Sequence, residues 1–413
     1  MAIVVQKFGG TSVADVERMR RCVRHVLRAR ERGDQVAIVV SAMGKTTDRL
    51  VGLASDAWDG LDGTPPRREM DMLLSSGEQV SIAVMAMVLE SLGQPAISFL
   101  GRQIGMTTDE AHTKARIASI DAPTIRRELD AGRVVVIAGF QGETPDGEIT
   151  TLGRGGSDTT AVAIAAAIEA DVCEIYTDVD GVYTADPRKV PGARRLETVG
   201  YGAMLEMAAL GAGVLHPRAV QFGARFNVPI RVLHSQADEP TGTLICKETP
   251  EMETIEVTSV ALKEDLGRIT LTELPNTPGV AARIFARLAA GNVFVDDIIQ
   301  TVVRAPDGAS SATVSFTVDH ADLTDIRPLL DAALAEVGGG TPTIDVGFCK
   351  VSAAGVGIRA HAGVAAKMFG ALSDVGVNIA NITTSEQKIS AILDKADGQT
   401  ALRAVHDAFD LGA

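Results

Sequence analysis

The chain has 413 residues, of which 46% are apolar and 22% charged, a globular composition long enough for two to three domains. Its 39 basic and 53 acidic side chains give a formal net charge of −14. This balance argues against a nucleic-acid or anionic-membrane partner, because both require extended basic surfaces. A local basic pocket for a small anion remains compatible with it.

The four cysteines are scattered without a CxxC pair, which is typical of reduced thiols rather than of a disulfide framework. The seven histidines show no spacing typical of a metal site, so we expect none. No signal-like segment opens the chain, and its apolar runs are too short to cross a bilayer. The sequence therefore predicts a soluble, cytoplasmic protein.

Up to about Leu244, short runs rich in Val and Ile alternate with longer amphipathic segments. The runs are residues 3–5, 36–40, 96–100, 134–138, 172–176 and 230–233. Continuous apolar strands separated by helices predict an open, mostly parallel sheet that helices cover on both faces, and hence an α/β domain.

The stretch QKFGGTSVAD follows the first strand and places Lys7 beside Gly9 and Gly10. Bare backbone N–H groups before a helix N-terminus form an anion site, and Lys7 would bridge a bound phosphate. A tight turn with a solvated lysine explains the same letters. The next helix is expected to be capped near Asp15 and to bury Val16, Met19, Val23, Val26 and Leu27.

Two more glycine-bearing turns follow predicted strands. SAMGKTTD spans residues 41–48, and LGRGGSDTTA begins at Leu152 and leads into an Ala-rich helix. Arg154 and main-chain N–H groups suit an anionic ligand, whereas Asp158 is equally compatible with a plain N-cap. Because the carboxyl ends of parallel strands meet at one edge, we expect the three loops to face one crevice.

Two further segments carry polar groups. SSGEQVSIAVMAMVL predicts a buried helix that starts at Ser75 or Ser76, with Glu78 in its first turn. Glu78 either interacts with the helix dipole or holds a substrate ammonium. YTDVDGVYTADPR, residues 176–188, is either a nucleotide-contacting loop or a surface excursion of turn formers.

Residues 240–250 mix turn formers and charges, which predicts a linker. Beyond them lies an internal repeat, in which residues 278–298 align without gaps on residues 362–382. Each copy predicts a strand, a glycine turn, an amphipathic helix and a second strand. Runs 312–318 and 389–393 are expected to complete small α+β sheets.

The chemistry that these loops favour is phosphoryl transfer, which needs mainly positioning and charge neutralisation. No Ser/His/Asp grouping supports nucleophilic hydrolysis. A carboxylate acceptor, with a pKa of about 4, is ionised at neutral pH and needs no general base.

Taken together, KFGGTSVAD, SAMGKTTD, SSGE, GFQG, TLGRGGSDTTA and TDVDGVYTADPR stand in the order found in aspartokinases of the amino-acid-kinase superfamily. The chain resembles that family over essentially all of its length. The resemblance implies an amino-acid-kinase fold at residues 1–245 and two ferredoxin-like ACT domains at residues 246–413. The first ACT copy would span about residues 265–340, and the second about 345–413 plus a strand from about 250–263.

The resemblance implies transfer of phosphate from ATP, accompanied by Mg²⁺, to the side-chain carboxylate of L-aspartate. Lys7, Gly9, Gly10 and Asp158 would serve catalysis. Thr47, Glu78, Phe140, Arg154 and Ser157 would bind aspartate, with Glu78 on its ammonium and Arg154 on its α-carboxylate. The nucleotide would contact Lys7, Gly10, Ser41, Thr177, Asp178, Tyr183 and Arg188.

The paired ACT copies imply feedback by lysine, threonine or both, and a homo-oligomer or an α/β-type oligomer. Residues that match effector positions are Asn276, Gly279, Ala281, Asp296, Gln300, Asn378, Ile379 and Ser385, which turn formation and interface packing also explain. Gly213 departs from the family, in which many members carry an ATP-contacting lysine. Met252 stands where an internal start for a second subunit would lie.

Two alternatives stay open at this stage. A kinase for glutamate, N-acetylglutamate or uridylate would share the glycine loops, although not the SSGE motif followed by two ACT copies. A catalytically inactive amino-acid sensor would explain Gly213 and the repeat, although Lys7, Glu78, Arg154 and Asp158 argue against it.

Overall fold

The chain divides into two compact units in the computed structural model. The structure describes residues 1–61, 63–210, 214–253, 255–291, 293–304, 310–358 and 361–412. Unit 1 comprises Met1–Thr184 and Ala193–Ile255, and unit 2 comprises Ala185–Gly192 and Glu256–Ala413. Each unit is described by itself.

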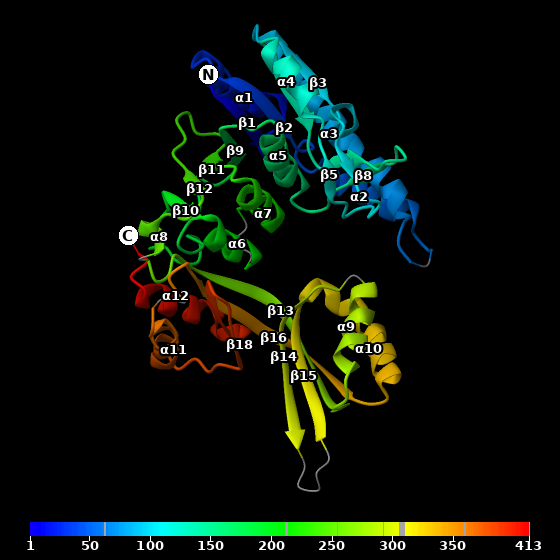
Figure 1. Cartoon of the computed structure of the whole chain (residues 1–413), viewed down its shortest axis with the longest axis vertical. Helices are drawn as coiled ribbons and strands as arrows, with labels where there is room; N and C mark the ends of the chain where they lie inside the picture. Colours follow the sequence, from blue (N-terminus) through cyan, green and yellow to red (C-terminus); the bar gives the residue numbers. More distant parts are fainter. Residues whose placement is uncertain are drawn as a thin grey trace. The chain divides into compact units, whose positions relative to one another are not determined.

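An eight-stranded sheet forms the centre of unit 1 (Figure 1), with the order β10-β12-β11-β9-β1-β2-β6-β3. One run of six consecutive strands, from β11 to the edge strand β3, corresponds to the six predicted strands: β11 (Ile230–His234), β9 (Val172–Thr177), β1 (Ile3–Phe8), β2 (Gln35–Val40), β6 (Val134–Ala138) and β3 (Ala96–Phe99). All neighbours in this run are parallel. The predicted open, mostly parallel sheet is confirmed.

The linker predicted at residues 240–250 is wrong in part. Residues 243–246 form β12 (Thr243–Cys246), which pairs antiparallel with β11 and parallel with β10 (Thr198–Gly200). The side chain of Thr243 is fully buried and hydrogen-bonds the backbone of Val182 and Leu196. These long-range hydrogen bonds stabilise a strand in a segment whose residues locally favour a turn.

Helices cover both faces of this sheet. α1 (Val16–Glu31) and α3 (Arg67–Ser91) share one core cluster with the even-numbered positions of β2 and β6. The odd-numbered positions face the other way, because side chains alternate along a strand, and α4 (Ala122–Asp130) and α5 (Gly156–Ala167) contact β2 there. α2 (Thr46–Ala57) contacts α3, and α6 (Tyr201–Ala209) contacts α7 (Pro217–Phe226).

The first helix begins where it was predicted to begin, and Asp15 caps it by accepting a hydrogen bond from the Arg18 amide. The predicted buried face is wrong at Val16, which is 44% exposed. His25 is buried instead, because its ring stacks on Tyr176 and bonds the Ser235 carbonyl. A long-range ring contact therefore overrides the local apolar pattern.

α3 has the length and apolar composition of a membrane-crossing helix, but half of its most apolar window is buried inside the protein. Ile82, Met85 and Leu89 pack in the core of unit 1. α3 is therefore built as a core helix.

A small second sheet of unit 1, which the sequence did not reveal, has the order β5-β4-β7-β8. It consists of β5 (Ile117–Ser119), β4 (Thr107–Thr108), β7 (Gln141–Glu143) and β8 (Ile149–Thr151), and a short 3₁₀ helix, Gly101–Ile104, precedes it. β8 packs against α3. This sheet leads directly into the glycine loop at Gly153.

Unit 2 has one six-stranded sheet, with the order β14-β15-β13-β16-β18-β17. Its strands are β13 (Ser259–Pro275), β14 (Val295–Arg304), β15 (Ser310–Asp319), β16 (Thr341–Ala354), β17 (Asn381–Thr384) and β18 (Lys388–Asp394). All pairings are antiparallel. The strands predicted at residues 312–318 and 389–393 are confirmed.

The two repeat copies place equivalent helices on this sheet, α9 (Val280–Ala290) and α11 (Val364–Asp374). Each begins after a glycine in the left-handed region, with φ of 92° at Gly279 and 110° at Gly363. The buried positions correspond pairwise: Val280 with Val364, Ile284 with Met368, and Leu288 with Leu372. α10 (Leu323–Val337) and α12 (Gly398–Ala408) complete the helical layer.

A buried ion cluster ties the strands of unit 2 together. The ammonium of Lys350 on β16, whose side chain is 1% exposed, lies 2.8 Å from Asp297 and 2.7 Å from Asp296 on β14. Asp297 also accepts hydrogen bonds from Thr317 on β15 and Thr383 on β17. Although burial disfavours its charge, the pKa of Lys350 is raised by the Asp297 carboxylate. The cluster thus joins both repeat copies.

We predict that Lys350→Ala lowers the opening free energy of β16 by about 3–5 kcal/mol, because it leaves the buried Asp297 carboxylate without its cation. Lys263, its register partner on β13, pairs with Asp319 at the surface, so Lys263→Ala is expected to cost at most about 1 kcal/mol. Amide hydrogen exchange of β16 and β18 in the full chain measures both. Equal losses of protection in the two variants would contradict the prediction.

Candidate active site

Two of the three predicted glycine loops follow the adjacent strands β1 and β2 and meet at their carboxyl ends. The third loop follows β8 of the small sheet, so its predicted place after a parallel strand of the main sheet is wrong, although α5, which begins after it, brings Asp158 to Lys7. The loop after β1 contacts the loop after β2, where the Gly44 amide bonds the Gly10 carbonyl at 3.0 Å. A Cβ at Gly10 would lie 2.9 Å from the Ala42 carbonyl oxygen, and one at Gly139 would lie 2.7 Å from the Ser157 hydroxyl. Only glycine therefore lets these loops come so close.

Lys7 lies at the end of β1 and is nearly buried. Its ammonium is 2.5 Å from a carboxylate oxygen of Asp158, in the first turn of α5, and 3.5 Å from the position that a Gly9 Cβ would occupy. The helix N-cap is Gly155, so the N-cap interpretation of Asp158 is wrong. Asp158 instead holds the lysine at the glycine loop.

Arg154 stands on the loop between β8 and α5, where Gly153 and Gly155 have positive φ angles of 77° and 66°. The side chain is exposed, and among the described residues it forms no ion pair or hydrogen bond. A guanidinium in this state is available to an anion. Ser157 is buried two residues after Gly155, and Phe140, with φ of 71°, contacts Gly156.

Glu78 lies in the middle of α3, because the helix begins at Arg67 and not at Ser75 or Ser76. The first-turn interpretation is therefore wrong. One carboxylate oxygen accepts a hydrogen bond from the Ala42 amide at 3.0 Å, and the other is buried without a partner among the described residues. Burial raises the pKa of Glu78 to about 7, against the Ala42 hydrogen bond. An unpartnered buried carboxylate oxygen fits a cationic ligand.

The remaining substrate and nucleotide candidates lie at strand ends and helix starts. Thr47 is in the first turn of α2, and the Ser41 amide bonds the Phe8 carbonyl after β2. Thr177 ends β9 and bonds Asp178. Tyr183 bonds Asp180 at 3.0 Å. These polar groups follow β2 and β9, the two strands that flank β1 in the sheet.

Arg188 differs from the other nucleotide candidates. It belongs to Ala185–Gly192, which packs as part of unit 2, and it makes a two-pronged ion pair with Asp186. In the same segment, Lys189 pairs with Glu264 at 2.7 Å. The predicted nucleotide loop is thus divided between the units after Thr184.

The effector candidates all lie in unit 2. Asn378 and Ile379 line a cavity of about 360 Å³ together with Phe369 and Ser373. Asn276 bonds Ser310, Gly279 caps α9, Ala281 lies in its first turn, Asp296 pairs with Lys350, and Gln300 is exposed on β14. The Ser385 amide closes the turn between β17 and β18 by bonding Lys388.

Sequence reasoning missed three residues that brace the site. Arg218 donates to the carbonyls of Leu152 and Ala115, and the His216 side chain fills the space beside Gly155. Asp71 is a fully buried carboxylate on α3. Its signal was the seven-residue spacing to Glu78, which puts both on one helix face once the helix is extended back to Arg67.

Comparison with known proteins gives two domain matches and full-length relatives. Residues 2–234 match the amino acid kinase family, and residues 351–409 match an ACT domain. The aspartokinase of Pseudomonas aeruginosa is 49% identical over 415 residues, covering 100% of this chain and 98% of that protein. The aspartokinase of Thermus thermophilus is also 49% identical, over 411 residues.

Solved structures agree with these relatives. Escherichia coli aspartokinase III in complex with aspartate and ADP, in the R-state, superposes with a TM-score of 0.82 at 28% identity, covering 98% of this chain and 99% of that one. Its T-state complex with lysine and aspartate gives a TM-score of 0.76 at 27% identity. Gly213, where the sequence departs from many family members, lies outside the described residues.

The raised pKa of Glu78 predicts a pH-dependent stability of the ligand-free protein. Folding favours the protonated carboxyl, so its contribution is greatest below the ordinary pKa of 4.5 and declines as pH rises to about 7. Relative to wild type, Glu78→Gln should gain about 3 kcal/mol between pH 4.5 and pH 8. Urea denaturation followed by the fluorescence of the single tryptophan, Trp58 in unit 1, measures this. A difference that stays constant with pH would contradict the assignment.

Proposed function

The chain belongs to the aspartate kinases, phosphotransferases of the amino acid kinase family, and from this premise we propose how its residues divide the work. ATP donates its terminal phosphoryl group to the side-chain carboxylate of L-aspartate, giving 4-phospho-L-aspartate and ADP, as the first step toward lysine, threonine and methionine. The observation that carries the proposal is an ion pair between Lys7 and Asp158, together with two charged side chains that have an unpaired group, Glu78 and Arg154, among the described residues.

The reaction needs charge neutralisation more than proton transfer. A carboxylate oxygen of the substrate attacks the γ-phosphorus while the bond from that phosphorus to the bridging oxygen breaks, and ADP leaves with the electron pair. The acceptor is already ionised, with a pKa of about 4, so no general base is required. Lys7 and the amides of Gly9 and Gly10 stabilise the transferring group, and Asp158 holds Lys7 in place.

The amino-acid end of the substrate is held by opposite charges. Its ammonium replaces the missing partner of Glu78, which favours the ionised form of that carboxyl, and its α-carboxylate takes the two-pronged guanidinium of Arg154. Thr47, Phe140 and Ser157 complete this side of the site.

The nucleotide is assigned to the carboxyl ends of β1, β2 and β9. Ser41, Gly10, Thr177, Asp178 and Tyr183 of unit 1 are assigned to it, and Arg188, which belongs to unit 2, is kept as a separate candidate for the nucleotide. Mg²⁺ would arrive on the phosphates, whose charge it neutralises, and Asp158 is the carboxylate beside Lys7 that suits its oxygen preference.

Regulation is assigned to the tandem ACT region, with the catalytic domain at residues 1–245 and the regulatory region at residues 246–413. Lysine, threonine or both act as effectors through Asn276, Gly279, Ala281, Asp296, Gln300, Asn378, Ile379 and Ser385. The cavity at Asn378 supports this proposal. Ile298, Val302 and Val303 on the edge strand β14 are exposed, which supports an oligomer formed through this region in the cytoplasm.

Replacing Lys7 and Arg154 by alanine, one at a time, distinguishes an effect on the chemical step from an effect on aspartate binding. We predict that Lys7→Ala lowers kcat by about 10²–10³-fold, because a charge that acts on the transition state is lost. Arg154→Ala mainly raises KM for aspartate, and Arg68→Ala, which removes two exposed ion pairs, with Glu69 and with Glu148, changes neither constant. A coupled ADP-release assay with aspartate, glutamate and N-acetylglutamate as acceptors measures kcat and KM of the three variants. Near-normal turnover in Lys7→Ala would remove Lys7 from the centre.

Feedback is tested on the full chain by measuring turnover with lysine and threonine, singly and together. We predict inhibition that Asn378→Ala weakens about tenfold without changing the uninhibited rate. Arg327→Ala is the matched control, because among the described residues this exposed side chain of α10 pairs with Asp331 of its own helix alone. Unchanged inhibition in Asn378→Ala would place the effector site elsewhere.

A further inference from the structure

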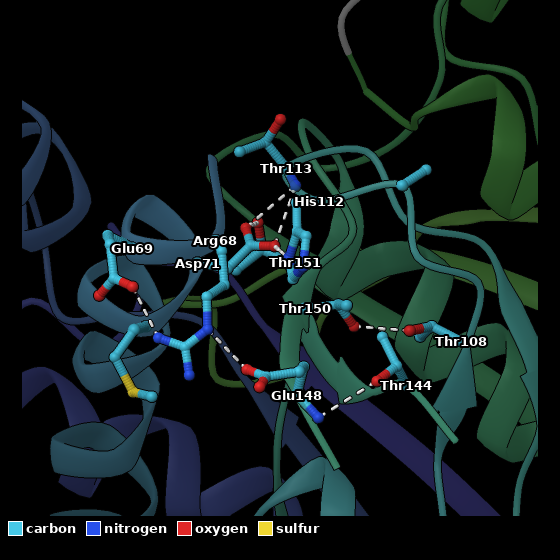
Figure 2. Close-up of polar contacts among 12 residues, drawn as sticks. Arg68, Glu69, Asp71, Thr108, His112, Thr113, Thr144, Glu148, Thr150 and Thr151 are labelled. Carbon is cyan, nitrogen blue, oxygen red and sulfur yellow. Dashed lines mark hydrogen bonds and ion pairs between the residues drawn. The ribbon is translucent and has the colours of Figure 1, made fainter. Parts of the chain in front are cut away.

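A second carboxylate of α3 is buried more deeply than Glu78 and has a full set of partners. Asp71 is 0% exposed. Its two oxygens accept the amide of Thr113 at 3.0 Å each, the hydroxyl of Thr151, and the Nδ1–H of His112 at 2.7 Å (Figure 2). None of the site roles proposed above uses Asp71.

The partners of Asp71 form the base of the loop that carries Arg154. Thr151 is the last residue of β8 and precedes Leu152 and Gly153 directly. A Cβ at Gly153 would lie 3.0 Å from the Thr113 carbonyl oxygen, so the two segments are in contact. They are also joined by the Ala115 amide, which bonds the Thr151 carbonyl at 3.0 Å. Asp71 therefore fixes both sides of the loop base.

Thr113 is held in a costly conformation. Its φ of 69° lies in the left-handed region, which a β-branched residue rarely adopts. Its amide bonds both oxygens of Asp71, so the buried carboxylate stabilises this geometry. Backbone strain of this kind is retained mainly where the surrounding structure positions a functional group.

We propose that Asp71 is a positioning residue of the amino-acid site, which sets the Gly153–Gly155 loop so that Arg154 meets the substrate carboxylate. Asp71 and Glu78 share one face of α3, two turns apart, so this helix fixes the loop at one end and the ammonium-binding group at the other. The inference rests on the proposed function, since it uses Arg154 as the carboxylate ligand.

The test compares two adjacent threonines of β8 that are equally buried. Thr151→Val removes the hydroxyl that bonds Asp71, and Thr150→Val removes one that bonds Thr108 on the opposite face (Figure 2). Thr151→Val and Asp71→Asn are expected to raise KM for aspartate about tenfold and to leave KM for ATP within about twofold. Thr150→Val is expected to change neither.

A rescue variant separates positioning from plain stability. Glycine adopts a positive φ without strain, so Thr113→Gly added to Asp71→Asn is expected to bring KM for aspartate back toward the wild-type value. If Asp71→Asn does not fold, the threonine pair still decides the question. Equal effects of Thr150→Val and Thr151→Val, or parallel changes in both KM values, would overturn the inference.

Arg154→Ala keeps this outcome distinct from failure of the proposed function. If Arg154→Ala leaves KM for aspartate unchanged, the assignment of Arg154 itself is wrong. If Arg154→Ala raises that KM and Thr151→Val does not, the assignment of Arg154 stands and only the role of Asp71 falls.

Discussion

The candidate site depends on main-chain segments that approach more closely than any side chain would permit. Gly10 lies against the Ala42 carbonyl, Gly77 of α3 against the Ala42 side chain, and Gly139 against Ser157. A Cβ at any of these positions would fall within 3 Å of its neighbour. The spacing of the backbone segments that carry Lys7, Glu78 and Asp158 is therefore set in part by these glycine contacts.

Charge pairing then distinguishes groups that are complete from groups that await a ligand. Lys350 is held in an internal pair with Asp297, and Asp71 has donors on both oxygens. Glu78 keeps one buried oxygen without a partner, and its pKa rises to about 7 as a result of that burial. The protein thus loses some stability near neutral pH at the position where we propose that the substrate ammonium binds.

The parallel strands and glycine turns could be predicted from the sequence, because their signals lie within a few residues of each other. The other features depend on contacts between residues that are far apart in the sequence. α3 starts at Arg67 without a side-chain cap, so its first turns were missed and Glu78 was placed at a helix start. β12 forms through bonds between Thr243 and the backbone near Val182, and Asp297 meets Thr383 across 86 residues. No local pattern encodes such contacts.

The repeat in unit 2 shows why two copies are needed. The first part of β13, Ser259 to Lys263, pairs with the last part of β16, whereas Arg268 to Thr272 pairs with its first part. Each long strand therefore serves the sheets of both copies, with β15 on one side and β18 on the other. A single copy would leave half of each long strand unpaired, and the Asp297 carboxylate without Thr383. The two copies therefore form one folding unit. A substitution that destabilises β13 or β16 in one copy also destabilises the strand pairing of the other copy.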